Sequence, residues 1–215
     1  KALAITDHGA MYGVIDFYKE AVAQGVKPII GCEVYVAPTG RKERAEVNGV
    51  KYHHLILLAE NQTGYRNLVK LVSLANIEGF YYKPRVDHEL LRQYHEGLIC
   101  LSACVAGEVP RALIADQPER AEAIVREYIE IFGKENYFLE IQNHGLPEER
   151  KANAGLAALA EKYGLGLVAT NDLHYVHRED SEFHDILLCI QMGKTVDDPD
   201  RMRFSSDDYY LKTPA

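Results

Sequence analysis

The chain has 215 residues, of which 47% are hydrophobic and 26% charged, and its formal net charge is −8 at pH 7. These values are typical of a globular protein with one sizeable core, and the acidic balance argues against a broad nucleic-acid-binding face on this chain alone. There is no apolar run of about 18 residues, no secretory signal and no disulfide-scaffold spacing of the four cysteines, which favours a cytoplasmic protein in a reducing compartment.

Strand and helix signals alternate along the chain. Apolar, β-rich runs predict strands at about residues 2–6, 29–36, 53–59, 97–102, 136–142 and 165–170. Apolar residues at three- and four-residue spacing predict helices over 62–76, 118–132, 147–163 and 181–192. This alternation predicts an α/β fold, a parallel sheet or barrel covered by helices, in a single domain.

Residues 37–51 interrupt the alternation. Their turn signal Asn48-Gly49, placed between two apolar runs, predicts a protruding hairpin. The segment also carries four basic residues, Arg41, Lys42, Arg44 and Lys51. They would be able to contact a phosphate backbone, but a solvated hairpin tip is the simpler interpretation and the one we favour.

Metal-type side chains stand at the ends of the predicted strands. Asp172 and His174 close the last one, and because residues two apart on a strand share a face, this pair is expected to reach one ion together. His54 fits less well, since it precedes the strand beside it. The whole set is His8, Glu33, His54, Cys104, Asp172 and His174. Carboxylate, imidazole and thiolate donors together are typical of Zn, Mn or Fe sites.

Each of these residues also has an ordinary explanation. A lone histidine is more often a structural residue, Asp7 before His8 suits a helix N-cap, and Cys104 can be a buried apolar side chain. Glu140 and His144 bracket another strand end with the same ambiguity. A coincidence at several successive strand ends is harder to accept, so we interpret the set as one metal site.

Several motifs, taken in order, resemble the PHP (polymerase and histidinol phosphatase) family. They are Thr6-Asp7-His8-Gly9, Gly31-Cys32-Glu33-Val34-Tyr35, His54-Leu55-Ile56-Leu57-Leu58-Ala59, Leu101-Ser102-Ala103-Cys104 and Asn171-Asp172-Leu173-His174. Two further segments, Phe80-Tyr81-Tyr82-Lys83-Pro84-Arg85 and Tyr209-Tyr210-Leu211-Lys212, resemble the branch that forms the N-terminal domain of bacterial replicative DNA polymerase alpha subunits. The resemblance covers essentially the whole chain.

This resemblance implies a distorted seven-stranded β/α (TIM-like) PHP barrel over residues 1–215, whose first strand would lie upstream of Lys1. It implies up to three divalent ions, Zn, Mn or Fe, bound by His8, Glu33, His54, Cys104, Asp172 and His174. Glu33 would bridge ions, and Asp7 would orient a ligand by hydrogen bonding. An opening His-x-His motif and a nearby Asp would also lie upstream, so we expect an N-terminally truncated domain that holds metal weakly by itself. The last ~15 residues would lead toward a polymerase core.

The reaction that the resemblance implies is phosphoester hydrolysis by a metal-bound hydroxide. In the polymerase branch this would be 3′→5′ exonuclease proofreading in DNA replication. Arg85 or Lys83 would be able to hold a phosphate near the site, and a charge on a surface loop is an equally good interpretation of both. The expected partners are DNA, the polymerase core of the same chain, a sliding clamp and other replicase subunits. Two alternatives stay open: a non-catalytic, metal-stabilised scaffold for a separate proofreading subunit, and a stand-alone phosphatase of the histidinol-phosphatase type.

Overall fold

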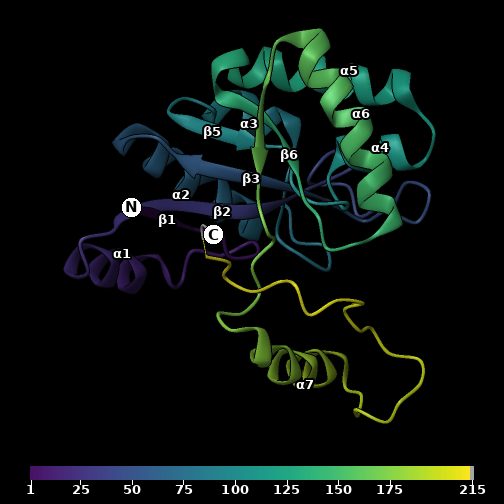
Figure 1. Cartoon of the computed structure of the whole chain (residues 1–215). Coiled ribbons are helices and arrows are strands. Elements are labelled where there is room, and N and C mark those ends of the chain that lie inside the picture. The colour runs from purple at the N-terminus through teal and green to yellow at the C-terminus, as the bar shows by residue number, and fades with distance from the viewer. Residues whose placement is uncertain (214–215) are drawn as a thin grey trace.

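A curved β-sheet lies at the centre of the protein (Figure 1). The computed structural model describes residues 1–213, and in it the sheet runs in the order β1-β2-β3-β5-β6-β7. The strands are β1 (Ala2–Ile5), β2 (Lys27–Val36), β3 (His53–Ala59), β5 (Leu98–Leu101), β6 (Tyr137–Ile141) and β7 (Gly166–Ala169), with β4 (Arg85–Val86) beside β2. The predicted α/β fold is confirmed, and the distorted barrel takes the form of a curled half-barrel.

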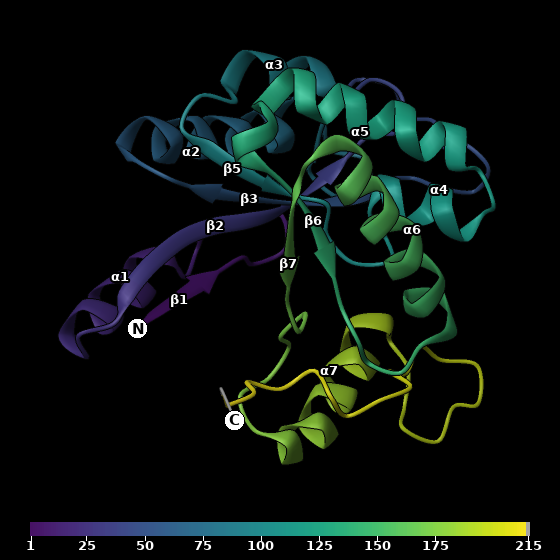
Figure 2. The same ribbon diagram turned by 45° about the horizontal axis from the view of Figure 1, so that its top comes forward.

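Most of the helices cover one face of this sheet (Figures 1 and 2). They are α2 (Gln62–Ile77), α3 (His88–Tyr94), α4 (Glu108–Ile114), α5 (Pro118–Phe132) and α6 (Pro147–Tyr163), while α1 (Val14–Ala23) packs beside β1 and β2. After β7 come the short helix η2 (Arg178–Asp180) and α7 (Ser181–Met192), set apart from the other helices (Figure 2). Within the described part of the chain, no helix is long and apolar enough to cross a membrane.

The predicted strands and helices all form, with ends shifted by no more than two residues. The sequence patterns missed α1, α3, α4 and the two-residue β4. Helices α3 and α4 have seven residues each, which is too short for a clear apolar period. Helix α1 was missed although it carries the expected spacing of apolar residues, Val14, Phe17, Tyr18 and Ala21.

One strand runs against the predicted direction. β3 is antiparallel to both of its neighbours, β2 and β5, whereas β1 and β2, β5 and β6, and β6 and β7 pair in parallel. The start of β3 therefore lies at the same rim of the sheet as the ends of β2 and β5. A purely parallel sheet is excluded, and this single reversal decides which residues meet at the rim.

The two faces of the sheet differ in what they bury. Alternate β2 residues Cys32, Val34 and Val36 join the main apolar core beneath the helices, together with Leu68 and Leu71 of α2. The opposite face carries a much smaller apolar cluster built on Ile56, Leu101 and Ala103. Glu33 lies between Cys32 and Val34, so its carboxylate is on this second, more polar face, where it is 5% exposed.

The turn predicted in hairpin 37–51 is confirmed. Val47 and Val50 bridge across Asn48 and Gly49, whose φ values of 51° and 78° match a type I′ turn. Arg41, however, is no part of a solvated tip: its buried guanidinium bonds Asp87 and Glu78, and it also pairs with Glu89. A buried arginine stays charged at such a site because the carboxylates around it replace the water it has lost.

Arg85 is likewise a structural residue, and the prediction of a phosphate contact there is wrong. Its side chain is fully buried, and its guanidinium donates hydrogen bonds to the carbonyl oxygens of Gly79, Arg41 and Glu43. These bonds tie hairpin 37–51 to the loop that precedes β4. No face of the guanidinium remains exposed for a phosphate.

A charged cluster joins three helices. The imidazole of His88 on α3 lies 2.9 Å from a carboxylate oxygen of Glu108 on α4 and 2.7 Å from one of Glu127 on α5. Burial alone would lower the pKa of His88, but the two carboxylates outweigh it and raise that pKa from 6.5 to about 9. The charged imidazolium therefore holds these helices together.

This cluster makes the stability of the protein depend on pH. Because the folded-state pKa of His88 is raised, its contribution is fully present below about pH 6.5 and is lost as the pH rises toward 9. We expect His88→Gln to lower the free energy of unfolding at pH 6 by on the order of 2 kcal/mol, and by much less at pH 9.5. Urea unfolding across this pH range measures the difference. His95→Gln, which removes an exposed imidazole beside α3, should leave the pH dependence in place. A level wild-type stability between pH 6.5 and 9 would contradict the assignment.

Candidate metal centre

The six predicted ligands lie at one rim of the sheet. His8 follows β1, Cys104 follows β5, and Asp172 with His174 follows β7, all of which run in the direction of β2. His54, which fitted the sequence pattern poorly, stands at the start of β3 and pairs with Tyr35 near the end of β2. The reversed direction of β3 therefore brings His54 to the same rim as the others.

Three of these residues form the centre of the cluster. One donor atom each from Glu33, His54 and Cys104 lies within 4.8 Å of the other two. Nδ1 of His54 is 2.5 Å from Oε1 of Glu33 and 3.6 Å from Sγ of Cys104. Nδ1 of His8 is 3.3 Å from the same Glu33 oxygen, which makes that oxygen the meeting point of two imidazoles.

Asp172 and His174 reach the cluster by a different route from the predicted one. Strand β7 ends at Ala169, so the argument that residues two apart on a strand share a face is wrong here. Asp172 instead has a left-handed backbone with a φ of 43°, which turns the chain toward His8. The ring centroid of His174 lies 5.8 Å from that of His8.

The orientation of His174 suits a metal ligand. Its Nδ1 lies 2.7 Å from the carbonyl oxygen of Asp172, and because a carbonyl accepts, Nδ1–H donates this bond. The proton is thereby fixed on Nδ1, and the lone pair of Nε2 remains for a cation. Ala103, directly before Cys104, is also left-handed with a φ of 62°. Such backbone in residues other than glycine costs on the order of 1 kcal/mol and is typical of functional sites.

The electrostatics of the cluster favour a bound cation. Burial would raise the pKa of Glu33, but the imidazoles of His54 and His8 outweigh it and lower that pKa to about 2. Burial and the charge of Glu33 raise the pKa of Asp172, and burial with these two carboxylates raises that of the Cys104 thiol. A divalent ion would relieve both effects at once.

One unsatisfied atom supports the same conclusion. Oε1 of Glu33 is buried and has no hydrogen bond of acceptable geometry, although two imidazole nitrogens lie close to it. A buried carboxylate oxygen without a hydrogen bond is costly unless an ion binds it. The donor set and this orphaned oxygen therefore fit a divalent metal ion held by Glu33, His54 and Cys104, with His8, Asp172 and His174 beside them.

Glu140 is a further acidic residue that the sequence left undecided. It is 5% exposed on β6, and its Oε1 accepts hydrogen bonds from Thr170 and Gln142, while its Oε2 has none. Burial, with the charges of Asp172 and Glu33, outweighs these bonds and raises its pKa to about 7. Its strand-end position was the only signal in the sequence, and many structural glutamates share it.

His144, in contrast, is a structural residue. Its Nδ1 is 2.5 Å from the carboxylate of Glu149, its Nε2 is 2.9 Å from the carbonyl oxygen of Asn171, and its ring stacks on Tyr209. Both ring nitrogens are therefore occupied. The residue ties the loop that carries Asp172 to helix α6 and to the C-terminal segment.

Asp7 supports the site through its backbone. Its carbonyl oxygen accepts a hydrogen bond from the N–H of Glu33, and among residues 1–213 its carboxylate makes no hydrogen bond to a predicted ligand. The carboxylate faces Gly13 at the start of α1. The predicted role of Asp7, to orient a ligand with its side chain, is therefore not seen in this structure.

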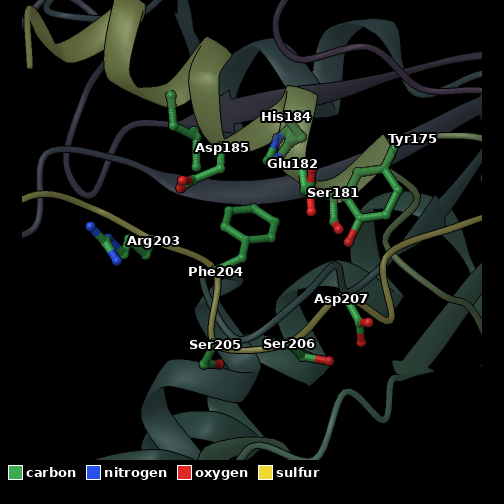
Figure 3. Close-up of a pocket in the computed structure, with 11 residues that line it drawn as sticks. Tyr175, Ser181, Glu182, His184, Asp185, Arg203, Phe204, Ser205, Ser206 and Asp207 are labelled. Atoms are coloured by element: carbon green, nitrogen blue, oxygen red, sulfur yellow. The ribbon is translucent and has the colours of Figure 1, made fainter. Parts of the chain in front are cut away.

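A pocket of about 450 Å³ adjoins the cluster, between α7 and the C-terminal segment (Figure 3). Its walls include His184 of α7 and Phe204, whose rings lie 5.3 Å and 4.9 Å from the ring of His174. The other lining side chains are mostly hydroxyl and charged groups, among them Ser181, Asp185 and Asp207 (Figure 3). None of the six predicted ligands lines the pocket, so it is a neighbour of the metal centre and not part of it.

Comparisons with known proteins agree with this geometry. The family model described as PHP domain matches residues 1–144. DNA polymerase III subunit alpha of Thermus aquaticus is 54% identical over 215 residues, and that of Treponema pallidum is 54% identical over 214. The subunit of Deinococcus radiodurans is 47% identical. Each alignment covers 98–99% of this chain but only 16–18% of the relative, so the chain spans less than a fifth of their length.

The contribution of Cys104 is testable by spectroscopy. When Co²⁺ is titrated into the full-length protein, a thiolate ligand gives an intense charge-transfer absorption in the near ultraviolet. We expect Cys104→Ser to abolish this absorption and to weaken Co²⁺ binding at least about tenfold, because a ligand is lost. Cys189→Ser, which alters a buried thiol on α7, is the matched control and should keep both. An unchanged absorption in Cys104→Ser would show that Cys104 only lines the site.

Proposed function

Because the chain belongs to the PHP domain family, we propose that it binds divalent metal ions at the rim cluster and hydrolyses phosphoesters there. We further propose that it is the PHP domain of a replicative DNA polymerase alpha subunit, and that its substrate is the 3′ end of a DNA strand. The reaction would then be 3′→5′ exonuclease proofreading during DNA replication in the cytoplasm. The domain would span residues 1–215, with its last ~15 residues leading toward the polymerase core, and its partners would include other replicase subunits.

The single observation that carries this proposal is the grouping of Glu33, His54 and Cys104, with His8 also close to the orphaned Oε1 of Glu33. Structural histidines and carboxylates normally satisfy one another, as His144 and Glu149 do. In the rim cluster one donor atom each of Glu33, His54 and Cys104 lies within 4.8 Å of the other two, which is close enough for a shared ion. The similarity to DNA polymerase III alpha subunits supports DNA as the substrate.

The residues of the site would have different roles in hydrolysis. Divalent ions, when bound, supply positive charge for a phosphate oxygen and activate a water molecule. Glu33, His54 and Cys104 would hold such an ion, while the bond between Nδ1 of His174 and the backbone of Asp172 fixes the direction of that imidazole. With Arg85 buried, Lys83 is the basic residue we propose for the phosphate: its Nζ lies 5.6 Å over the ring of Tyr35, which packs against His8 and His54.

The two alternatives, a stand-alone phosphatase and a metal-stabilised scaffold, require different properties of the site. A stand-alone phosphatase is less well supported, because the long relatives that match nearly the whole chain are polymerase subunits. A metal-stabilised scaffold needs the ions but no substrate. The exposure of His8, whose side chain is 45% accessible, favours catalysis because it leaves the ion centre open to a ligand from solution.

A nuclease assay tests the proposal. With Mn²⁺ or Zn²⁺, the full-length protein should release nucleotides from a 3′-labelled DNA primer, and Asp172→Asn should slow this by at least ~100-fold while the domain stays folded by circular dichroism. Asp197→Asn changes an exposed aspartate outside the cluster and is the matched control. If the metal-loaded wild-type protein releases no nucleotide, the proposed exonuclease activity is wrong and the scaffold function is favoured.

A further inference from the structure

The segment Phe80-Tyr81-Tyr82-Lys83 has no role in the metal cluster itself, yet it exposes large aromatic side chains. Phe80 is 56% and Tyr82 62% exposed, in a loop that is otherwise anchored by the buried Arg85. Exposure of large apolar rings to water is unfavourable, and exposed apolar patches often mark binding sites. The segment, which we call the aromatic loop (residues 80–83), therefore has the character of a binding surface.

The conformation of Tyr82 is specific. Tyr81 and Lys83 bridge across it, and its own φ is 60°, in the left-handed region that favours glycine. Nζ of Lys51 lies 3.7 Å from the centroid of its ring, close enough for a cation–π contact. The rings of Tyr81 and Tyr82 are nearly perpendicular, with centroids 4.7 Å apart. Lys51 and Tyr81 thus contact Tyr82, whose side chain nevertheless remains largely exposed.

The aromatic loop also lies against the metal centre. The ring of Pro84, directly after the loop, packs close to Gly9, where an added Cβ would come within 3.0 Å of it. Gly9 is the neighbour of His8. Lys83 lies over Tyr35, whose ring is 6.2 Å from His8 and 5.4 Å from His54. Lys83, and with it the aromatic loop, is therefore linked through Tyr35 to two residues of the cluster.

We propose that the aromatic loop is a base-stacking subsite for single-stranded DNA, in which a nucleobase near the 3′ end stacks on the exposed ring of Tyr82. Lys83 and Lys51 provide the positive charge for the adjoining phosphates. This inference rests on the proposed function, because it names the subsite through which the metal centre would take a polynucleotide strand. Such a subsite would make a frayed, single-stranded 3′ end a better substrate than a base-paired 3′ end.

The charge around the loop fits this occupant. The chain as a whole is acidic, with a net charge of −8, so a polyanion needs a local basic contact. Within residues 1–213, neither Lys51 nor Lys83 forms an ion pair with a carboxylate; each lies over an aromatic ring instead. Aromatic rings beside unpaired basic groups are the usual composition of single-strand binding surfaces, because every base has a face that can stack.

Photo-crosslinking tests the subsite without requiring hydrolysis. A single-stranded oligodeoxynucleotide with 5-iododeoxyuridine at its last two positions and phosphorothioate linkages is bound to the full-length protein in the presence of Mn²⁺. After irradiation, mass spectrometry should locate the crosslink within residues 80–83. Tyr82→Leu should reduce its yield roughly 5- to 100-fold, whereas Tyr82→Phe, which keeps the ring, should retain it.

Kinetics provide a second readout. On single-stranded DNA, Tyr82→Leu should raise KM by a similar factor and change kcat much less, because the ring binds the strand away from the reacting atoms. Tyr18→Leu is the matched control: Tyr18 is a 52% exposed tyrosine on α1, in a groove beside Ala59 at the far end of β3 from His54. It should leave both the crosslink and the kinetics unchanged.

The outcomes separate this proposal from the proposed function. A Tyr82-dependent crosslink without nucleotide release would support the subsite and overturn the exonuclease. Nucleotide release with no crosslink in residues 80–83, or with a yield that Tyr82→Leu does not alter, would overturn the subsite and leave the exonuclease standing. Loss of the crosslink in Tyr82→Phe as well would also overturn it, since the stacking ring is still present in that variant.

Discussion

A buried carboxylate needs positive charge beside it, and much of this molecule is arranged around that requirement at Glu33. The residue lies in the middle of the ten-residue strand β2, on the sheet face that the helices do not cover. Imidazoles come to it from both sides, His8 after β1 and His54 at the start of β3, and they hold its pKa at about 2. The negative charge of Glu33 is still not fully balanced, because its Oε1 has no hydrogen bond and further acidic groups lie nearby. Such unbalanced negative charge would favour a bound cation.

The surrounding structure keeps this cluster rigid. Arg41 and Arg85 are buried and hold hairpin 37–51 and the loop before β4 through carboxylates and backbone carbonyls. On the other side of the rim, His144 fixes the loop of Asp172 to α6, and Asn171 bonds the C-terminal segment. Residues with the chemistry of ligands or phosphate contacts thus serve as structural anchors. What distinguishes them from the cluster is that their polar atoms are fully bonded within the protein.

The aromatic loop and the metal cluster would divide substrate recognition between them. Ions bound at the cluster would supply positive charge for any phosphate, which by itself does not discriminate between a small ester and a polynucleotide. The exposed ring of the loop would add a contact that favours a substrate with unpaired bases. A proofreading site benefits from such a division, because a mispaired primer end frays more easily than a correctly paired one.

The sequence by itself determined the predicted strands and long helices, since each carries a clear apolar period. It also predicted six metal-type side chains, of which the structure brings Glu33, His54 and Cys104 within 4.8 Å of one another. The sequence did not determine the direction of β3, and therefore could not explain why His54 lies at the rim with the other residues. It also placed Asp172 and His174 at the end of strand β7, which in the structure ends at Ala169. Those features depend on pairing between distant segments and on a left-handed residue, which no local pattern encodes. The prediction for Arg85 differed from the structure for the same reason: whether an arginine faces solvent or the carbonyl groups of other loops is decided only when those loops meet.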